Sequence, residues 1–321
     1  MTAAFVGIDW GTTHRRAVLL SRGGDVLAEH ADAEGALACA GRFRPALEAL
    51  LAHWPAAGDD VPVVMAGMVG SATGWQAVPY LGGETPLGAL GRSLVPVAEA
   101  PPGRRWFIVP GYCIRGEAGE GEPDVDVMRG EETQLLGAME LLDAGAGGSP
   151  HASDGHYLLP GTHSKWVRLE AGRVVELRTF MTGELFAQLR ERGTLAGVMR
   201  GAHGPVAAAD PAFGRGVRAM AGSPPPALSH ALFGARAHVV TGGLAPDSAA
   251  AYVSGLLVGA EWADARQRPS HEAPVRIIGE PALAALHAAC AAHFGRSVQA
   301  LDARAVQLAA WRALAREGAP S

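Results

Sequence analysis

The chain contains a diverged internal repeat, and this repeat constrains the fold more than any other feature. Its first copy, Phe5–Leu20, places an apolar run on each side of the loop Gly11-Thr-Thr13. Its second copy, Tyr157–Glu170, places similar runs on each side of Gly161-Thr162. A glycine-bearing turn and a third apolar run follow each copy. The pattern predicts two hairpins, which we expect to grip two phosphates of one nucleotide from opposite sides of a cleft.

The first loop has residue types that suit a phosphate. Gly11 allows a close backbone approach, while Thr12 and Thr13 bring hydroxyls and backbone N–H groups to the same point. Asp9 stands just before the bend, where its carboxylate would repel a bare phosphate. A divalent cation between the two groups removes that repulsion. The loop therefore predicts a nucleotide-kinase arrangement with a metal beside Asp9.

The single lysine of the chain lies in the second loop. Of the 27 basic residues, 26 are arginine and one, Lys165, is lysine. A compact ammonium acts as a point charge toward phosphate, which makes Lys165 a candidate phosphate ligand. A lone lysine retained by chance is the alternative. His14 and His163 occupy matching places in the two loops, and both a ligand contact and an ordinary surface position remain open for them.

Length and composition predict a globular protein. The 321 residues are enough for two domains, and the 48% apolar residues are enough for sizeable cores. No apolar run reaches the roughly 18 residues of a membrane span, and the N-terminus lacks the pattern of a signal peptide, so we expect a cytoplasmic protein. The isolated cysteines Cys39, Cys113 and Cys290 predict neither a disulfide framework nor a zinc site. A net charge of −5 without a basic cluster argues against nucleic acid and membranes as partners.

The first half is expected to form a domain over residues 1–120, with the first phosphate loop and part of the sugar site. Leucines at helical spacing predict a helix over Ala36–His53, and apolar runs predict strands over Val61–Met68 and Trp106–Pro110. Glu117–Asp126 has the Gly, Pro and acidic residues of a surface connector. Residues 121–321 are then the second domain, with the second phosphate loop, the catalytic base and the adenosine site.

The second half alternates helices and strands. Helical patterns cover Thr182–Arg192, Asp210–Ala221 and Asp247–Arg266, and a βαβα order follows over Val275–Gly279, Pro281–Phe294, Ser297–Leu301 and Ala303–Glu317. This order puts Gly279 at the carboxyl end of a strand and beside a helix N-terminus. Adenosine binds at such positions in α/β sheets, so Gly279 is a candidate adenosine contact.

Glu131 and Glu132 open a predicted helix shortly before the second loop. Carboxylates near a helix N-terminus stabilise the helix by about 0.3–1 kcal/mol, so capping alone explains the pair. In the functional interpretation, one of the two faces the cleft and accepts the proton of an attacking hydroxyl. Asp126 is a third carboxylate nearby.

Six blocks of sequence carry a family resemblance. They are Ile8–Thr13 with Arg16, Val64–Ser71 with Gly74-Trp75, Val127–Leu135, Leu159–His163 with Lys165-Trp166, Arg178-Thr179 with Met181–Leu185, and Ser254–Leu257 with Gly259–Glu261. Together they resemble the actin/hexokinase/Hsp70 ATPase superfamily and, within it, the 2-dehydro-3-deoxygalactonokinase family. One Asp-x-Gly-Thr-Thr motif would be weak evidence, whereas six blocks in order span almost the whole chain.

The resemblance implies an α/β fold of two ribonuclease-H-like (actin/hexokinase-like) halves, arranged as two domains with a nucleotide cleft between them. It implies transfer of the γ-phosphate of Mg-ATP to the 6-hydroxyl of 2-dehydro-3-deoxy-D-galactonate, a step of galactonate catabolism. In such a reaction Mg²⁺ and loop amides offset the phosphoryl charge, a carboxylate deprotonates the hydroxyl, and closure excludes water.

The resemblance also implies roles for residues. Asp9 would organise Mg²⁺ through water. Contacts to ATP would come from Gly11, Thr12, Thr13, Gly161, Thr162, Lys165 and Gly279. Glu131 would be the base, by its place after Gly130, with Glu132 and Asp126 in reserve. The sugar acid would be bound by Arg16, Gly70, Ser71, Arg129 and Arg178. The three arginines suit a carboxylate because they can bind it bidentately, although each also suits an ordinary ion pair.

The chain departs from the superfamily pattern at two points. Paired glycines are common near the adenine, whereas this chain has Gly279-Glu280. Related carbohydrate kinases use Asp as the base, whereas Glu131 has an extra methylene that moves its carboxylate. These departures leave the adenosine contact and the identity of the base to be tested.

Two alternative functions remain open from the sequence. One is another enzyme of the superfamily, either a kinase for a different sugar derivative or a phosphohydrolase that activates water. The other is a non-enzymatic, actin-like nucleotide switch, for which neither the Glu131-Glu132 pair nor Lys165 is needed. The sequence does not separate the galactonate from the gluconate epimer of the substrate. The sequence also does not fix the oligomeric state, and a homodimer, common among such kinases, is one possible assembly.

Overall fold

The computed structural model describes residues 2–55, 57–116, 124–147, 151–200, 204–267 and 274–317. The chain forms two compact units. The first contains Met1–Asp154, Arg168–Leu177 and Ala303–Ser321, and the second contains Gly155–Val167 and Arg178–Asp302. The domain boundary predicted between residues 120 and 121 falls within residues 117–123, outside the described residues. A division at that point stays a prediction.

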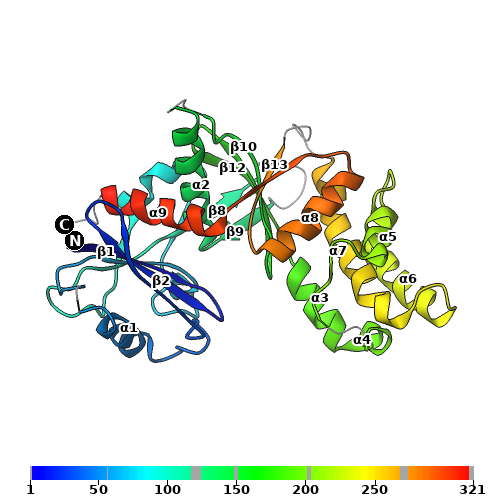
Figure 1. Cartoon of the computed structure of the whole chain (residues 1–321), viewed down its shortest axis with the longest axis horizontal. Helices are drawn as coiled ribbons and strands as arrows, with labels where there is room; N and C mark the ends of the chain where they lie inside the picture. Colours follow the sequence, from blue (N-terminus) through cyan, green and yellow to red (C-terminus); the bar gives the residue numbers. More distant parts are fainter. Residues whose placement is uncertain are drawn as a thin grey trace. The chain divides into compact units, whose positions relative to one another are not determined.

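A six-stranded sheet of order β3-β2-β1-β4-β7-β6 is the frame of the first unit (Figure 1). Its strands are β1 (Ala3–Trp10), β2 (Arg15–Ser21), β3 (Val26–Asp32), β4 (Val63–Gly67), β6 (Val95–Pro96) and β7 (Trp106–Ile108). β1 is antiparallel to β2 and parallel to β4, with Asp9 opposite Arg16 and Trp10 opposite Gly67. The carboxyl ends of β1 and β4 therefore lie side by side, at the edge where open α/β sheets bind ligands.

The helices of the first unit are α1 (Phe43–Ala52), α2 (Glu131–Gly145) and α9 (Ala303–Glu317). Ile8 and Trp10 of β1 share a buried core with the apolar face of α1. Trp311 of α9 packs on β1, where a Cβ on Gly7 would lie 2.4 Å from its ring. Because successive side chains of a strand point to opposite faces, α1 and α9 cover the two faces of β1. This double burial explains the nearly continuous apolar run in the sequence.

A second, three-stranded sheet of the first unit has the order β5-β8-β9. Its strands are β5 (Tyr80–Leu81), β8 (Gly111–Arg115) and β9 (Val125–Met128), and short 3-10 helices occupy Met68–Gly70 and Leu87–Ser93. The chain runs from β9 through Arg129 and Gly130 directly into α2. The start of α2 is thus set by this small sheet.

A five-stranded sheet of order β12-β11-β10-β13-β14 repeats the strand order of the first sheet. Its strands are β10 (Gly155–Leu159), β11 (Ser164–Glu170), β12 (Arg173–Phe180), β13 (Val275–Ile278) and β14 (Val298–Leu301). β10 is parallel to β13, and β13 is parallel to β14, as β1, β4 and β7 are in the first sheet. The predicted duplicated ribonuclease-H-like, actin/hexokinase-like fold is confirmed.

Helices supply most of the core of the second unit. They are α3 (Thr182–Glu191), α4 (Gly193–Val198), α5 (Pro211–Met220), α6 (Leu228–Val240), α7 (Ala249–Ala265) and α8 (Pro281–His293), with a 3-10 turn at Pro246–Ser248. α7 is buried along nearly all of its length. Gly216 of α5 and Gly255 of α7 meet backbone to backbone, since a Cβ on either would lie within 2.2 Å of the other helix. This close crossing explains a helix that is apolar on every side.

The predicted elements differ from the structure in both halves of the chain. The helix predicted over Ala36–His53 begins only at Phe43, and Leu37 is 69% exposed. The N–H groups of Ala36 and Leu37 donate to the carbonyls of Gly11 and Thr12 and are not used within a helix. Gly41 then adopts a φ of +74°, which interrupts the pattern before α1. The sequence reasoning also missed α4, α6, β8 and β9.

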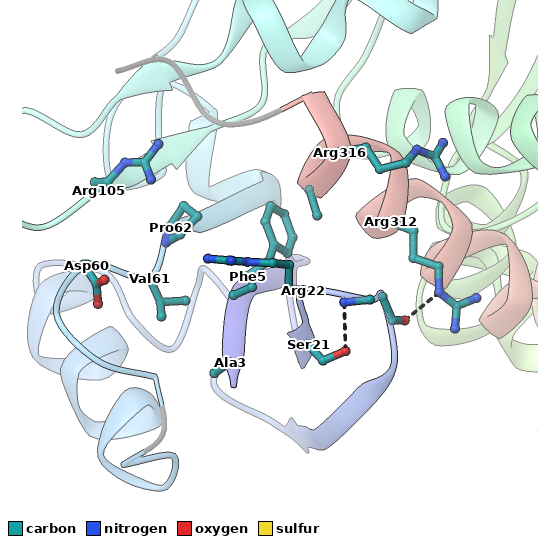
Figure 2. A pocket seen from close by; sticks show the side chains of 14 residues that line it. Ala3, Phe5, Ser21, Arg22, Asp60, Val61, Pro62, Arg105, Arg312 and Arg316 are labelled. Carbon is teal, nitrogen blue, oxygen red and sulfur yellow. Dashed lines mark hydrogen bonds between the residues drawn. The ribbon is translucent and has the colours of Figure 1, made fainter. Parts of the chain in front are cut away.

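A cavity of about 510 Å³ lies at the amino end of β1, away from the Gly11 loop (Figure 2). Its arginines are largely engaged with the protein, because Arg312 donates to the Gly24 carbonyl at 2.8 Å and Arg316 pairs with Glu140. These contacts fasten α9 to the strands and to α2.

None of the described helices is both long and apolar enough to cross a membrane.

Candidate active site

Three backbone segments of the first unit converge at the end of the first sheet. Gly67, at the end of β4, has a φ of +93°, and Gly130, just before α2, has a φ of +111°. A Cβ on Gly67 would lie 2.8 Å from the Trp10 carbonyl oxygen, and a Cβ on Gly130 would lie 3.3 Å from the Gly67 Cα. Only glycine combines such angles with such close approach. The ends of β1 and β4 and the start of α2 therefore form one compact site.

Asp9 brings a carboxylate to this site. Its side chain is 28% exposed, and its Oδ2 lies 4.0 Å from Nη1 of Arg16. Burial raises the pKa of Asp9 to about 6, the Arg16 charge lowers it, and the Glu131 charge raises it. Glu131 and Asp9 therefore act on each other electrostatically. Two neighbouring carboxylates form an acidic site that a bound cation would stabilise, beside the Arg16 guanidinium that already faces Asp9.

The structure separates the two glutamates at the start of α2. Glu132 is fully buried, and both of its carboxylate oxygens accept from the Gly130 N–H, at 2.9 and 2.7 Å. Burial raises the pKa of Glu132 to about 8, and the neighbouring Glu131 charge raises it further. Glu131 is only partly buried, and its Oε2 accepts from the Arg129 N–H at 3.0 Å. Glu131 is thus the more accessible carboxylate, while Glu132 faces the protein.

Gly130 is held on both sides. Glu132 accepts its N–H, and the Thr133 hydroxyl donates to its carbonyl oxygen at 2.6 Å. Two side chains of the first turn of α2 thereby fix the unusual backbone angle of Gly130, and with it the direction in which Glu131 leaves the helix.

Asp126, the reserve carboxylate, lies on β9, where its Oδ1 accepts from the Val127 N–H at 2.7 Å.

Arg129 enters the same site with unused donors. Its Nη2 donates to the Val78 carbonyl at 2.9 Å, and its guanidinium lies 4.3 Å over the ring of Tyr80. Its Nε and Nη1 are buried and have no hydrogen-bond partner among the described residues. A Cβ on Gly70 would lie 3.0 Å from Nη1. The structure therefore brings together Arg129 and Gly70, two predicted substrate-binding residues, and leaves two buried nitrogens of Arg129 without a hydrogen-bond partner in the described chain, while the Arg129 charge also acts on Glu132.

The remaining predicted substrate residues are spread over both units. Arg16 is 61% exposed on β2 beside Asp9. Ser71 follows the 3-10 helix that contains Gly70, and its hydroxyl lies 3.3 Å from that of Thr73. Arg178 belongs to the second unit, where its Nε lies 3.4 Å from the Asp264 carboxylate. Arg178 thus has a structural ion pair, as the alternative interpretation expected.

The first phosphate loop leaves its amide donors unused. Within the described chain, no hydrogen bond uses the N–H of Gly11, Thr12 or Thr13. The Thr13 hydroxyl lies 2.9 Å from Nδ1 of His14. Among the described residues, the one atom within 4 Å of a Cβ on Gly11 would be the His14 carbonyl oxygen, at 3.2 Å. The loop is therefore open and rich in donors, as a phosphate site requires.

The second phosphate loop lies at the corresponding position of the second unit. Gly161 and Thr162 connect β10 to β11. Gly279 packs against this loop, because a Cβ there would lie 3.0 Å from the Pro160 ring. Lys165 is on β11 and is 7% exposed, and its Nζ donates to the Thr179 hydroxyl at 2.8 Å. His163 pairs with Glu184 at 2.7 Å.

A buried glutamate supports the second loop and was not predicted as a site residue. Glu261 of α7 is fully buried, and its Oε2 accepts from Nε1 of Trp166 at 2.8 Å. Burial raises the pKa of Glu261 to about 7, against the effect of the Thr182 hydroxyl. Tyr80 and Val78, which hold Arg129, were missed as well. For Glu261 the sequence offers one signal, an acidic residue inside an apolar helical segment, in the block Gly259–Glu261.

Comparison with known proteins gives a consistent result. A family model described as 2-keto-3-deoxy-galactonokinase matches residues 9–314. The 2-dehydro-3-deoxygalactonokinase of Escherichia coli (strain K12) is 33% identical over 287 residues, which are 89% of this chain and 88% of that protein. A Rhizobium meliloti protein described as a candidate 2-dehydro-3-deoxygalactonokinase is 35% identical over 307 residues, 94% of each chain.

A solved structure agrees with these matches. The crystal structure of a candidate 2-dehydro-3-deoxygalactonokinase from Sinorhizobium meliloti superposes with a TM-score of 0.85, at 32% identity and over 98% of each chain. Sequence and fold thus match the same kind of protein over nearly the whole length. The chain belongs to the 2-keto-3-deoxy-galactonokinase family.

Proposed function

We propose that this chain is an ATP-dependent sugar-acid kinase that phosphorylates the 6-hydroxyl of 2-dehydro-3-deoxy-D-galactonate, in galactonate catabolism. Family membership supports the kinase class, and the names of the relatives support the substrate. The observation that carries the proposal is the convergence of Asp9, Glu131 and Arg129 on one edge of the first sheet, where Nε and Nη1 of Arg129 have no hydrogen-bond partner in the described chain. This edge combines a metal-binding acid, a base and an anion receptor.

Glu131 is proposed as the general base. It is the carboxylate of the pair that is partly accessible, and it interacts electrostatically with Asp9. It takes the proton of the sugar 6-hydroxyl as the oxygen attacks the γ-phosphorus of ATP, and the bond to the ADP oxygen breaks. Glu132 holds Gly130 instead, because both of its oxygens already accept the Gly130 N–H. Glu132 is therefore a positioning residue.

The residues around Asp9 fit a magnesium ion. Mg²⁺ in phosphoryl-transfer sites takes one or two carboxylates and completes its shell with water and phosphate oxygens. Asp9 offers a carboxylate whose ionisation burial disfavours, and a cation would reverse that cost. When bound, Mg²⁺ supplies neutralisation of phosphate charge. Gly11, Thr12 and Thr13 would donate to ATP from the first unit, and Gly161, Thr162, Lys165 and Gly279 would contact ATP from the second.

Arg129 is proposed to bind the carboxylate of the sugar acid. Its Nε and Nη1 are buried without partners in the described chain, and a buried guanidinium in that state gains most from an anion. Val78 and Tyr80 fix its plane. Gly70 leaves room beside Nη1, and Ser71 is an additional donor near the same turn. Arg16 and Arg178 stay predictions, as do a homodimer and a cytoplasmic location.

The test is ADP formation by the purified chain with Mg-ATP and a panel of acceptors. The panel contains 2-dehydro-3-deoxygalactonate, its gluconate epimer, glucose, glycerol and a blank. We expect kcat/KM for the galactonate derivative to exceed that of the neutral acceptors by at least a hundredfold. Equal ADP formation in the blank would instead identify a phosphohydrolase, and no ADP with any acceptor would contradict a kinase.

A further inference from the structure

Each phosphate loop is tied to the segment that follows the third strand of its own half. In the first unit, the N–H of Ala36 donates to the Gly11 carbonyl at 2.9 Å, and the N–H of Leu37 donates to the Thr12 carbonyl at 3.1 Å. In the second unit, the N–H of Glu184 donates to the Thr162 carbonyl at 2.9 Å. Thr12 and Thr162 hold equivalent places in the repeat. We call residues 35–37 the first brace and residues 182–184 the second brace.

A glycine in each brace touches the loop backbone. A Cβ on Gly35 would lie 2.3 Å from the carbonyl carbon of Thr13 and 2.5 Å from the Thr12 oxygen. A Cβ on Gly183 would lie 2.4 Å from the Gly161 oxygen. Real Cβ atoms do not approach backbone so closely, so each contact requires glycine. The two braces thus share the hydrogen bond and the close glycine contact, although their sequences differ.

The braces determine where the loop amides point. In a trans peptide the C=O and the following N–H point in opposite directions across one plane. Because the Gly11 and Thr12 carbonyls turn toward the first brace, the N–H groups of Thr12 and Thr13 turn away from it. The same geometry turns the His163 N–H away from the second brace. None of these three N–H groups is used in a hydrogen bond of the described chain.

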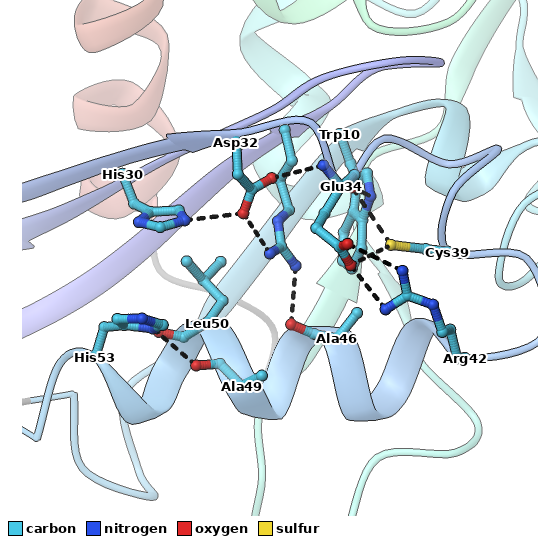
Figure 3. A network of polar contacts seen from close by, with 11 residues as sticks. Trp10, His30, Asp32, Glu34, Cys39, Arg42, Ala46, Ala49, Leu50 and His53 are labelled. Atoms are coloured by element: carbon cyan, nitrogen blue, oxygen red, sulfur yellow. Dashed lines mark hydrogen bonds and ion pairs between the residues drawn. The ribbon is translucent and has the colours of Figure 1, made fainter.

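Both braces are fastened to the body of their unit. Ahead of the first brace, the Glu34 carbonyl accepts from Nε1 of Trp10 at 2.8 Å, and its carboxylate pairs with Arg42 (Figure 3). The second brace is the first turn of α3, which begins at Thr182. Thr182 neighbours the buried carboxylate of Glu261, which also accepts from Trp166. Each brace is therefore a fixed support for its loop.

We propose that the two braces are a duplicated positioning device that aims the amide donors of both loops at the phosphates of ATP, so that nucleotide affinity depends on Gly35, Leu37, Gly183 and Glu184. None of these residues was predicted to bind ATP. The inference rests on the proposed ATP-dependent function. It adds that the brace N–H groups, by donating to the loop carbonyls, set the direction in which the loop N–H groups point.

The test compares proline with alanine at the two donor positions. Leu37→Pro and Glu184→Pro remove the brace N–H, whereas Leu37→Ala and Glu184→Ala keep it and lose only the side chain. The Leu37 side chain is 69% exposed, and Glu184 lies in the first turn of α3, where proline is tolerated. Both Glu184 variants lose the ion pair with His163, so the difference between them reports the backbone N–H of the second brace alone.

The readouts are the KM for ATP, the KM for the sugar acid, and the Kd of a non-hydrolysable ATP analogue by calorimetry. We expect each proline variant to raise the ATP KM and the analogue Kd at least tenfold relative to its alanine partner, with the sugar-acid KM within threefold. Equal nucleotide affinity in the proline and alanine variants, with native circular dichroism, would overturn the proposal. Analogue binding is measured without an acceptor, so a failed sugar-acid assay contradicts the proposed substrate and leaves this comparison valid.

Where a proline variant unfolds, alanine substitutions at the two brace glycines test the proposal, with two other glycines as controls. Gly35→Ala and Gly183→Ala press a methyl group against the loops, whereas Gly145→Ala and Gly197→Ala add the same group in open space. We expect at least a fivefold weaker analogue affinity in the first two than in the last two. Similar affinities in all four folded variants would overturn the proposal.

Discussion

Arg129 is the residue proposed to bind the carboxylate of the sugar acid. Its guanidinium is fixed by Val78 and Tyr80, yet two of its nitrogens lack partners in the described chain. We predict that Arg129→Lys raises the KM for the sugar acid by about 10- to 100-fold, because an ammonium cannot bind a carboxylate bidentately. Steady-state kinetics should show a nearly unchanged KM for ATP. The surface variant Arg44→Lys is the control, and a sugar-acid KM unchanged in Arg129→Lys would remove Arg129 from the substrate site.

Glu132 should behave as a positioning residue. In Glu132→Gln the amide oxygen can still accept the Gly130 N–H, so we predict a kcat within about tenfold of wild type. Glu132→Ala removes the acceptor of this part-buried N–H, and an unsatisfied donor typically costs about 1–3 kcal/mol of stability. Thermal unfolding and kcat measured on both variants distinguish the roles. A loss of a hundredfold or more in folded Glu132→Gln would transfer the base role from Glu131 to Glu132.

At the scale of elements, the repeated hairpins were predictable because their signal is local. Apolar runs, glycine and threonine stand next to one another in the sequence, and the structure has strands at both places. The start of α1 was not predictable, because Ala36 and Leu37 donate to a loop about 25 residues earlier. These tertiary hydrogen bonds use N–H groups that a longer helix would need, and the spacing of leucines contains no information about them.

The candidate site was predictable in composition but not in arrangement. The acids, glycines and arginines were chosen because their types suit phosphoryl transfer, and their roles stay predictions. The difference between Glu131 and Glu132 depends on which carboxylate turns back to Gly130, and the residues are adjacent, so spacing cannot separate them. The support of Arg129 by Val78 spans 51 residues of sequence and leaves no local pattern.

At the scale of the whole molecule, buried titratable groups should make stability depend on pH. His287 in the second unit is 2% exposed and accepts from Nε1 of Trp262 at 3.3 Å, and burial lowers its pKa to about 3. Its unfolded pKa is near 6.5. The unfolded chain therefore binds more protons as pH falls from about 6.5 toward 3, and stability decreases by up to about 1.4 kcal/mol per pH unit.

The acids with raised pKa values act in the opposite direction. Asp9, Glu132 and Glu261 bind protons more readily when folded, so acidification through their range adds stability. We therefore predict the effect of His287 as a difference between wild type and His287→Gln. Urea unfolding at pH 7 and pH 5 should show that acidification changes the free energy of unfolding more favourably in the variant than in wild type, because the variant lacks the His287 contribution. An identical pH dependence in the two proteins would contradict a neutral, buried His287.

The central claim is that the carboxylate at the start of α2 drives phosphoryl transfer to a sugar acid. The direct measurement is kcat for 2-dehydro-3-deoxygalactonate with saturating Mg-ATP, in wild type and in Glu131→Gln. The predicted result is a loss of at least a hundredfold in kcat, with the KM for ATP within threefold, because a neutral amide cannot accept the proton of the hydroxyl. A kcat within threefold of wild type in folded Glu131→Gln would contradict the account.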